Sequence, residues 1–304
     1  EKTKALEDKV RGFKNFIFDC DGVLWGGVDI IDHSKDFIQW LSKNDKRIFL
    51  LTNTSYYSRA SVHDKFKALM GIDLPIDNVY TANSLTGQYI KQYLKDKKKA
   101  YVIGSKFLVE EIRKSGIEVL PGYTHDEKYG SFSFISKEEM HFRDIDLVVL
   151  GYDDNINLYK LAFASYAIQC GATLLSTNAD KNTQSPGIPE LKIVGNGSFT
   201  KLLEAAAETK AIVAGKPNPK IFDTIDAMHG LEKKDCVFIG DNLHTDIKFA
   251  NDAGVSSVLV LTGVTELHKL DMHLKMKDSG VPDYIFDDLS FKTARGGKLS
   301  EHHH

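Results

Sequence analysis

The chain has 304 residues, of which 42% are hydrophobic, so it is long enough for about two domains that each bury a core. Its formal net charge is −3, with acidic and basic residues interspersed, which argues against a surface for nucleic acid or an anionic membrane. The dense basic run over 95–99 is interrupted by Asp96 and is typical of a solvated helix end. No apolar stretch approaches the roughly 20 residues of a membrane span, and residues 1–11 do not resemble a signal peptide. We therefore expect a cytoplasmic protein.

The three cysteines, Cys20, Cys170 and Cys236, lack the CxxC spacing of zinc sites and are too few for a disulfide scaffold. We expect free thiols. Cys20 stands between two acids, which predicts a raised thiol pKa. Residues 294–304 end in three histidines and predict an expression tag, so we leave this region out of the fold argument.

The predicted elements alternate between strand and helix, which is typical of a parallel sheet. The apolar run 16–18 predicts a first strand, and a helix over 34–43 follows, with its apolar residues on one side. A strand over 48–51 comes next. A helix over 59–70 then ends at Gly71, where the absence of a side chain suits a C-cap.

The pattern in the middle of the chain predicts a separate folded unit. It has strand-like and helical runs, at 101–103, 147–150, 158–170 and 173–175. More than a hundred residues is too long for a loop. We therefore predict a discontinuous core domain over 1–82 and 208–293, and an inserted domain over 83–207. Residues 195–198, near the return to the core, predict either a hinge or an ordinary loop before a Ser-capped helix.

Polar motifs follow four apolar runs directly. They are Asp19 and Asp21 after 16–18, Thr52 and Asn53 after 48–51, Lys216 after 212–215, and Asp241 after 237–240 with Asp246 five residues further on. Each motif alone also describes a turn, cap or loop. Because parallel strands point one way, their carboxyl ends would gather these groups in one cleft. Carboxylates, a hydroxyl and an ammonium together fit phosphate monoester chemistry.

These motifs, in this order, resemble the four motifs of the haloacid dehalogenase-like hydrolase superfamily. The chain is most similar to the branch of 4-nitrophenyl, phosphoglycolate and pyridoxal phosphatases, over roughly residues 13 to 290. The sequence segments 148–153, 176–180 and 260–264 support this resemblance. It implies an α/β fold with a Rossmann-like parallel-sheet core and a large inserted α/β cap domain of the C2 type.

The chemistry and the resemblance together assign roles to the acids. We expect Asp19 to attack phosphorus and form an aspartyl-phosphate. Mg²⁺ suits a site of carboxylate and phosphate oxygens, with Asp19 and Asp241 as side-chain ligands. The resemblance implies that Asp21 binds the metal through its backbone carbonyl, which leaves its side chain to protonate the leaving group and then activate water.

The remaining residues are expected to bind the substrate. Thr52 and the amide of Asn53 can donate to the phosphoryl group, and Lys216 can neutralise it. Asp246 would hold Lys216 or a metal-bound water. The polar loop 181–186 belongs to the part of the cap that contacts the leaving group in related enzymes, and Lys181 is our candidate to pair with a substrate carboxylate.

Several functions stay open at this point. The carboxyl group of Asp21 can protonate a leaving group, which an alkoxide needs. It therefore favours a phosphatase or a phosphomutase over a dehalogenase or a P-type ATPase. A non-catalytic phosphoryl-ligand binder is the alternative of a different class. Phosphoglycolate and 4-nitrophenyl phosphate are the first substrates to consider, with pyridoxal phosphate and sugar or nucleotide monophosphates as alternatives. We also carry the expectation of a homodimer through the cap.

Overall fold

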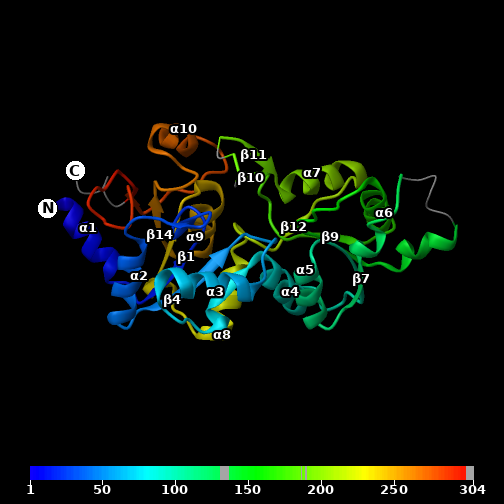
Figure 1. Cartoon of the computed structure of the whole chain (residues 1–304), viewed down its shortest axis with the longest axis horizontal. Helices are drawn as coiled ribbons and strands as arrows, with labels where there is room; N and C mark the ends of the chain where they lie inside the picture. Colours follow the sequence, from blue (N-terminus) through cyan, green and yellow to red (C-terminus); the bar gives the residue numbers. More distant parts are fainter. Residues whose placement is uncertain (131–136, 186, 189, 299–304) are drawn as a thin grey trace. The chain divides into compact units, whose positions relative to one another are not determined.

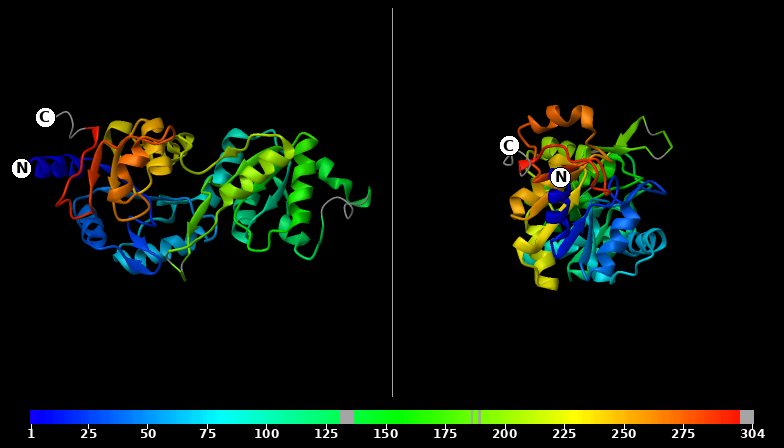
Figure 2. Two further views of the ribbon diagram at one scale, coloured as in Figure 1. Left: turned by 90° about the horizontal axis from the view of Figure 1, so that it is seen from above. Right: turned by 90° about the vertical axis from the view of Figure 1, so that its left-hand side faces the viewer.

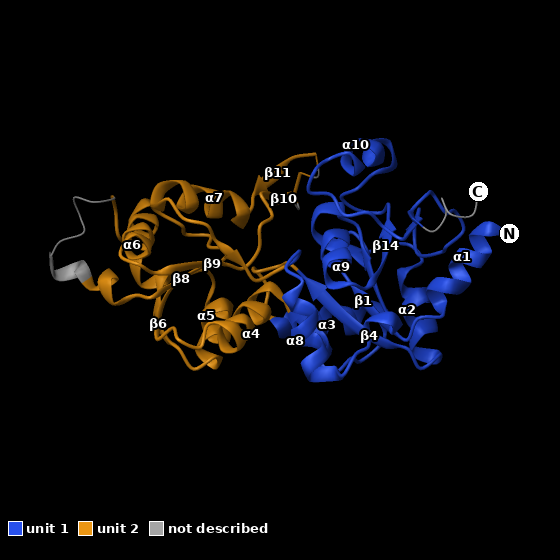
Figure 3. Ribbon diagram, turned by 180° about the vertical axis from the view of Figure 1, so that it is seen from behind, with its two compact units in different colours: residues 1–52, 59–80, 216–304 blue, residues 53–58, 81–215 orange. Residues whose placement is uncertain are grey.

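The computed structural model describes residues 1–130, 137–185, 187–188 and 190–298. The chain forms two compact units (Figure 3): a first unit of residues 1–52, 59–80 and 216–304, and a second of residues 53–58 and 81–215. Each unit is built on its own sheet with helices beside it (Figure 1). The prediction of an α/β fold with a Rossmann-like parallel-sheet core is confirmed. Within the described ranges, every helix is too short or too polar to cross a membrane.

The first unit has a six-stranded sheet. The order across it is β15 (Tyr284–Phe286), β14 (Ser256–Val260), β13 (Cys236–Gly240), β1 (Asn15–Phe18), β4 (Arg47–Thr52) and β5 (Val79–Thr81). The central strand β1 pairs in parallel with β13 on one side and with β4 on the other. The short antiparallel ribbon of β2 (Trp25–Gly26) and β3 (Asp29–Ile30) follows β1 along the chain.

Helices cover both faces of this sheet. They are α1 (Lys2–Arg11), α2 (Ser34–Lys43), α3 (Arg59–Met70), α8 (Lys220–His229), α9 (Lys248–Ala253) and α10 (Leu270–Leu274). Side chains alternate along a strand, so Phe16 and Phe18 of β1 point to one face, where they pack in a core with residues of α1, α2 and α3. Leu259 of β14 packs in a separate core with Leu243 and Ile247. Burial on both faces explains why the strands are apolar throughout.

The second unit has a five-stranded parallel sheet in the order β12 (Ile212–Val213), β9 (Thr173–Ser176), β8 (Leu147–Leu150), β6 (Lys99–Ile103) and β7 (Glu118–Pro121). One core holds residues of α4 (Ala82–Tyr93) and α5 (Lys106–Lys114). The other holds residues of α6 (Leu158–Gln169) and α7 (Asn196–Ala207). The hairpin of β10 (Asn182–Gln184) and β11 (Lys192–Val194) extends away from this sheet (Figure 2).

Short helical turns complete both units. The 3₁₀ turns are Ile76–Asn78, Gly122–His125, Lys137–Asp144, Lys233–Asp235 and Leu267–Lys269, and the π-helix η5 covers Leu243–Ile247. The helices predicted over 34–43 and 59–70 are confirmed with these bounds. Gly71 has a φ of 73°, and its backbone N–H donates to Lys67 O at 3.0 Å, as expected of a C-cap glycine.

One strand assignment is wrong. The sequence predicts that the apolar run 212–215 joins the same sheet as the other motif-bearing strands, in a core domain that resumes at 208. Instead, β12 pairs in parallel with β9 in the sheet of the second unit, and Gly215 N donates to Thr177 O at 2.9 Å. The chain returns to the first unit only at Lys216. A two-residue strand carries too little pattern to indicate which of two parallel sheets it completes.

The predicted boundary at residue 294 is also too early. Ala294 forms a bridge with Phe286, and the Arg295 guanidinium donates to both carboxylate oxygens of Asp287 at 2.8 and 3.0 Å. This segment lies beside α1 (Figure 2). The Arg11 guanidinium of α1 is 5.3 Å from the centre of the Phe291 ring. Residues 299–304 of the predicted tag lie outside the described residues.

A buried ion cluster supports the second unit. Lys160 of α6 has no exposed surface, and its Nζ lies 2.5 Å from Asp126 Oδ1 and 2.8 Å from Asp153 Oδ2. It also donates to Asn155 O at 3.0 Å. A buried ammonium with three acceptors fixes the two loops that supply them, and removing it would leave the Asp153 carboxylate buried without this partner.

We expect Lys160→Met to lower the free energy of unfolding of the second unit by about 3 to 5 kcal/mol, because it leaves buried charge uncompensated. Urea unfolding followed by circular dichroism measures this loss. The matched control is Lys201→Met on α7, whose exposed ammonium pairs with Glu204 at 3.3 Å, for which we expect at most about 1 kcal/mol. Equal losses in the two variants would contradict a special role for the Lys160 cluster.

Candidate active site

Three carboxylates meet at the carboxyl edge of the six-stranded sheet. Asp19 follows β1, Asp241 follows the neighbouring strand β13, and Asp246 lies in the π-helix η5. One oxygen from each lies within 4.8 Å of the others. Asp241 and Asp246 are buried, whereas Asp19 is partly accessible. The parallel pairing of β1 with β13 therefore brings together acids that are more than 220 residues apart in the sequence.

The Lys216 ammonium lies among these acids. Its Nζ is 3.1 Å from Asp19 Oδ1 and 2.8 Å from Asp246 Oδ1, and it donates to Leu51 O at 3.0 Å. The side chain is 1% exposed. Burial by itself lowers the pKa of Lys216, but the Asp19 and Asp246 carboxylates outweigh burial and raise it, so the ammonium stays charged.

Asp246 is held on both of its oxygens. Oδ1 accepts from Lys216, and Oδ2 accepts the backbone N–H groups of Asp241 and Asn242 at 3.0 and 3.2 Å. Burial and the Asp19 charge raise the pKa of Asp246 to about 7, with Lys216 acting in the opposite sense. This geometry makes Asp246 a link between the Lys216 ammonium and the loop that carries Asp241.

Asp241 lies in a tight cradle. A Cβ atom added at Gly22 or Gly263 would lie 2.2 or 2.0 Å from Asp241 Oδ2, so neither position has room for a side chain. Gly22 also has a φ of 85°, which glycine adopts without strain. Val264 N donates to Asp241 Oδ2 at 2.8 Å. The cradle fixes the carboxylate and leaves no neighbouring side chain to neutralise it at these two positions.

Negative charge exceeds positive charge in this cluster. Burial raises the pKa of Asp241 well above its usual range, and the charges of Asp19 and Asp246 raise it further. With all three acids ionised against the Lys216 ammonium, two negative charges remain uncompensated. A divalent cation with a preference for oxygen ligands fits such a donor set. Among the residues that the structure describes, the side chains of Asp19, Asp241 and Asp246 form a group that could hold it.

Asp21 lies apart from this cluster of side chains. The residue as a whole is exposed, but its carboxylate is partly buried at the contact in which Oδ1 accepts the indole N–H of Trp25 at 3.1 Å. Desolvation by the surrounding protein raises the pKa of Asp21, although the charge of Lys65 and the indole hydrogen bond act to lower it. Cys20, between the two acids, is buried, and burial followed by the charges of Asp19 and Asp21 raises its thiol pKa, as predicted. Both other cysteines are free as well.

Thr52, the last residue of β4, is buried in the first unit, and the chain enters the second unit at the next residue, Asn53. There the Asn53 side-chain amide donates to Asp180 Oδ2 at 3.1 Å. Lys181 also belongs to the second unit, with an exposed side chain at the base of the β10–β11 hairpin. The structure thus brings together Asp19, Lys216, Asp241 and Asp246, whereas Asn53 and Lys181 are placed only within the second unit.

The sequence does not predict several partners of these residues. Asp180 ends the segment 176–180, which supports the family resemblance. That segment does not indicate a contact between Asp180 and Asn53. The Trp25 indole follows Asp21 by four residues without a pattern that links them. The backbone N–H of Val264 cannot be found from sequence, since its role depends only on the path of the loop after β14.

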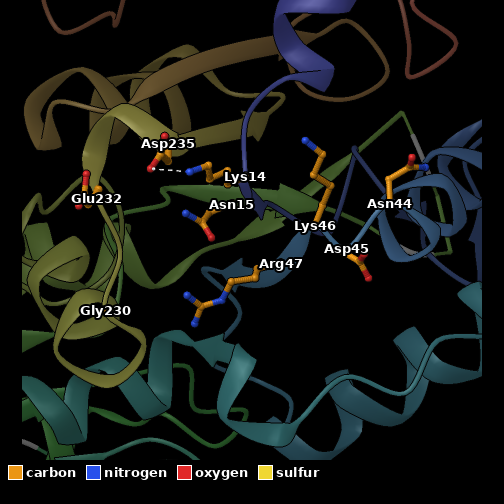
Figure 4. Close-up of a pocket in the computed structure, with 9 residues that line it drawn as sticks. All are labelled: Lys14, Asn15, Asn44, Asp45, Lys46, Arg47, Gly230, Glu232 and Asp235. Atoms are coloured by element: carbon orange, nitrogen blue, oxygen red, sulfur yellow. Dashed lines mark ion pairs between the residues drawn. The ribbon is translucent and has the colours of Figure 1, made fainter.

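A separate hollow of about 480 Å³ lies at the other edge of the six-stranded sheet, where β1 and β4 begin (Figure 4). It is lined by Lys14, Asn15, Asn44, Asp45, Lys46, Arg47, Gly230, Glu232 and Asp235. Its cations already have protein partners: Lys14 pairs with Asp235 at 3.8 Å, Lys46 donates to Phe13 O, and Arg47 donates to His229 O. This hollow therefore lies away from the acidic cluster and lacks its chemistry.

Comparison with known proteins gives consistent matches. The family model described as haloacid dehalogenase-like hydrolase matches residues 16–118, and a second, described as HAD-hydrolase-like, matches residues 213–291. The chain is 32% identical to phosphoglycolate phosphatase 2 of Arabidopsis thaliana, with 94% of this chain and 93% of the relative covered.

Two solved structures have a similar fold. A p-nitrophenyl phosphatase from Archaeoglobus fulgidus is 26% identical with a TM-score of 0.77, covering 91% of this chain and 97% of the other. A glycerol phosphate phosphatase from Mycobacterium tuberculosis, in complex with magnesium, is 25% identical with a TM-score of 0.74, covering 92% and 76%. Since the order of the motifs, the fold and these relatives agree, the chain belongs to the haloacid dehalogenase-like hydrolase superfamily, as a phosphoric monoester hydrolase.

Proposed function

We propose that the chain hydrolyses small phosphate monoesters through an aspartyl-phosphate on Asp19, with Mg²⁺ as cofactor. The observation that carries this proposal is the buried cluster of Asp19, Asp241 and Asp246 around Lys216. A carboxylate nucleophile, a fixed ammonium and an excess of acid are what a covalent phosphoryl transfer requires. The named activities of the relatives support the same class of substrate.

In this proposal Asp19 attacks phosphorus and Asp21 gives a proton to the departing alkoxide oxygen. The raised pKa of Asp21 favours the protonated form that this step needs. The carboxylate that remains then takes a proton from the water that hydrolyses the aspartyl-phosphate. Thr52, the backbone N–H of Asn53 and Lys216 bind the phosphoryl oxygens, and Asp246 keeps Lys216 in place.

Mg²⁺ would be held by the side chains of Asp19 and Asp241 and by the backbone carbonyl of Asp21, with Asp246 beside them. When bound, it would screen the repulsion between the Asp19 carboxylate and the phosphate dianion. The uncompensated negative charge of the cluster and the cradle around Asp241 support this assignment. The magnesium in the mycobacterial relative's structure supports it as well.

Asp19→Asn should abolish turnover of 4-nitrophenyl phosphate, with a loss of about 10³-fold or more, because an amide of similar shape is a poor nucleophile. Release of nitrophenolate by the purified variant measures the loss, and circular dichroism checks the fold. Asp29→Asn, which alters an exposed carboxylate on β3, is the matched control and should keep wild-type activity. Near-wild-type turnover by a folded Asp19→Asn protein would falsify the covalent mechanism.

Metal exchange tests the cofactor. Removing divalent ions with EDTA should stop turnover, and adding Mg²⁺ should restore it. Ca²⁺ should inhibit, because it takes more oxygen ligands at longer distances than Mg²⁺ and would hold the Asp19 carboxylate away from phosphorus. Initial rates across a series of metal concentrations measure both effects. Unchanged activity in EDTA, or equal turnover with Ca²⁺, would reject Mg²⁺ as the cofactor.

We propose phosphoglycolate as the first substrate to test, with Lys181 as the residue that pairs with its carboxylate. Lys181→Ala should lower kcat/KM for phosphoglycolate by about ten- to a hundredfold, the worth of one charge-assisted hydrogen bond, and barely change it for 4-nitrophenyl phosphate. The control is Lys192→Ala, which removes an exposed lysine from the other strand of the same hairpin. Equal losses on both substrates, or none, would remove Lys181 from the specificity site.

The alternatives differ in what a wider assay would show. Faster release of phosphate from pyridoxal phosphate, a sugar phosphate or a nucleotide would replace phosphoglycolate as the substrate. Phosphoryl transfer to a second hydroxyl, without release of phosphate, would indicate a phosphomutase. Phosphate binding without either reaction would indicate a non-catalytic binder. A cytoplasmic location and a homodimer through the cap remain predictions from the sequence.

A further inference from the structure

The motif 176–180 carries a carboxylate that the proposed reaction does not use. Asp180 Oδ2 accepts two amide donors, Asn53 Nδ2 at 3.1 Å and Asn178 Nδ2 at 2.8 Å. All three residues lie in the second unit. An ionised acceptor fixes which end of the Asn53 side chain faces it, because a carboxylate only accepts hydrogen bonds. Asp180 therefore determines the orientation of the residue that follows Thr52.

Asp180 is itself firmly placed. Its neighbour Asn178 is only 6% exposed, and Asn178 Oδ1 accepts from Thr177 Oγ1 at 2.8 Å. The backbone carbonyl of Asn178 accepts from Asn196 Nδ2 at 3.3 Å, and that of Asp180 accepts from Gly197 N at 2.8 Å. The start of α7 thus holds the turn 177–180 through Asn196 and Gly197.

The close packing of α7 on this turn depends on two glycines. A Cβ added at Gly197 would lie 2.2 Å from Ala179 O, and one at Gly195 would lie 2.3 Å from Asp180 O. Gly195 is the N-cap of α7 and has no side chain with which to cap it. Residues 195–197 are therefore a buried packing contact, and the N-cap residue of the helix is Gly195 rather than a serine, whereas a hinge here stays a prediction.

The same turn also contacts the segment that precedes Lys216. Gly215 N donates to Thr177 O at 2.9 Å. A Cβ at Gly215 would lie 2.5 Å from Thr177 O and 2.8 Å from Asn53 Oδ1, so Gly215 and the Asn53 side chain are in close contact. The turn 177–180 therefore joins two segments, one that continues from Thr52 and one that leads into Lys216.

We propose that Asp180 is a positioning residue for phosphoryl binding: its hydrogen bond to the Asn53 side chain sets the direction of the Asn53 backbone N–H. This inference rests on the proposed function. The side chain and the backbone N–H of one residue share a Cα atom, so fixing the first restricts the second. Asn53 follows Thr52 directly in the chain, so the backbone N–H that the Asp180 contact orients is the one next to Thr52.

A residue that positions the phosphoryl-binding groups acts on every substrate alike. The leaving group differs between phosphoglycolate and 4-nitrophenyl phosphate, whereas the phosphoryl group is the same. Loss of the Asp180 contact should therefore lower kcat/KM for both substrates by the same factor and weaken inhibition by inorganic phosphate. A residue that contacts the leaving group, as proposed for Lys181, would give unequal losses.

The experiment compares Asp180→Ala, Asp180→Asn, Asn53→Ala and the double variant Asn53→Ala/Asp180→Ala with the wild type on both substrates. Asp180→Ala should lower kcat/KM about ten- to a hundredfold. Asp180→Asn keeps an oxygen that can accept both amide donors, so it should recover most of the activity. The double variant should lose no more than the worse single variant, because both changes remove one contact. Thermal unfolding confirms that each variant is folded, and Glu110→Gln, an exposed carboxyl on α5, is the control.

The inference is overturned if folded Asp180→Ala keeps kcat/KM within twofold of the wild type, if the losses of the single variants multiply in the double variant, or if the loss differs between substrates. It is also overturned if Asp180→Asn is as poor as Asp180→Ala while both are folded, since an accepting oxygen would then not matter. An inactive wild type would reject the proposed function and this inference together, whereas an active wild type with an unaffected Asp180→Ala rejects the inference alone.

Discussion

The ion pairs of Lys216 are the interaction on which the active site depends. Its ammonium is buried, and it stays charged only because Asp19 and Asp246 lie within 3.1 Å of it. The relation is mutual, because Asp246 is completely buried and would be costly to ionise without the ammonium. Through Asp246 Oδ2 the same contact orders the loop after β13, which carries Asp241. One cation therefore holds Asp19 and Asp246 directly, and through Asp246 it orders the backbone that carries Asp241.

The cluster also carries more negative than positive charge when its acids are ionised. Burial raises the pKa of both Asp241 and Asp246, and the negative charge of Asp19 raises each of them further. A structural ion-pair network would balance its charges, whereas a site that receives a divalent cation has to keep acid in excess. Gly22 and Gly263 leave room for the Asp241 carboxylate, because a Cβ atom at either position would collide with it.

The fold and the acidic cluster could be predicted for a physical reason. Strands buried on both faces are continuous apolar runs, and a polar residue that ends such a run lies at the sheet edge, as Asp19 and Asp241 do. It is harder to predict which of the two sheets a given strand joins. The run before Lys216 has the same apolar character as the run before Asp241, yet it pairs with β9 in the other unit. Contacts such as Asn53 with Asp180 depend on three-dimensional packing over 127 positions and leave no local pattern.

The strand order of the first unit has a consequence for the order in which the chain folds. The central strand β1 has one neighbour, β4, that follows within about thirty residues, but its other neighbour β13 begins only at Cys236. The sheet of the second unit is complete once Val213 has been made. On the ribosome, the second unit can therefore form its core while β1 still lacks half of its hydrogen-bond partners. The long sequence separation of the β1–β13 pair also predicts that the first unit is the slower of the two to fold, because closing so large a loop precedes any gain from pairing.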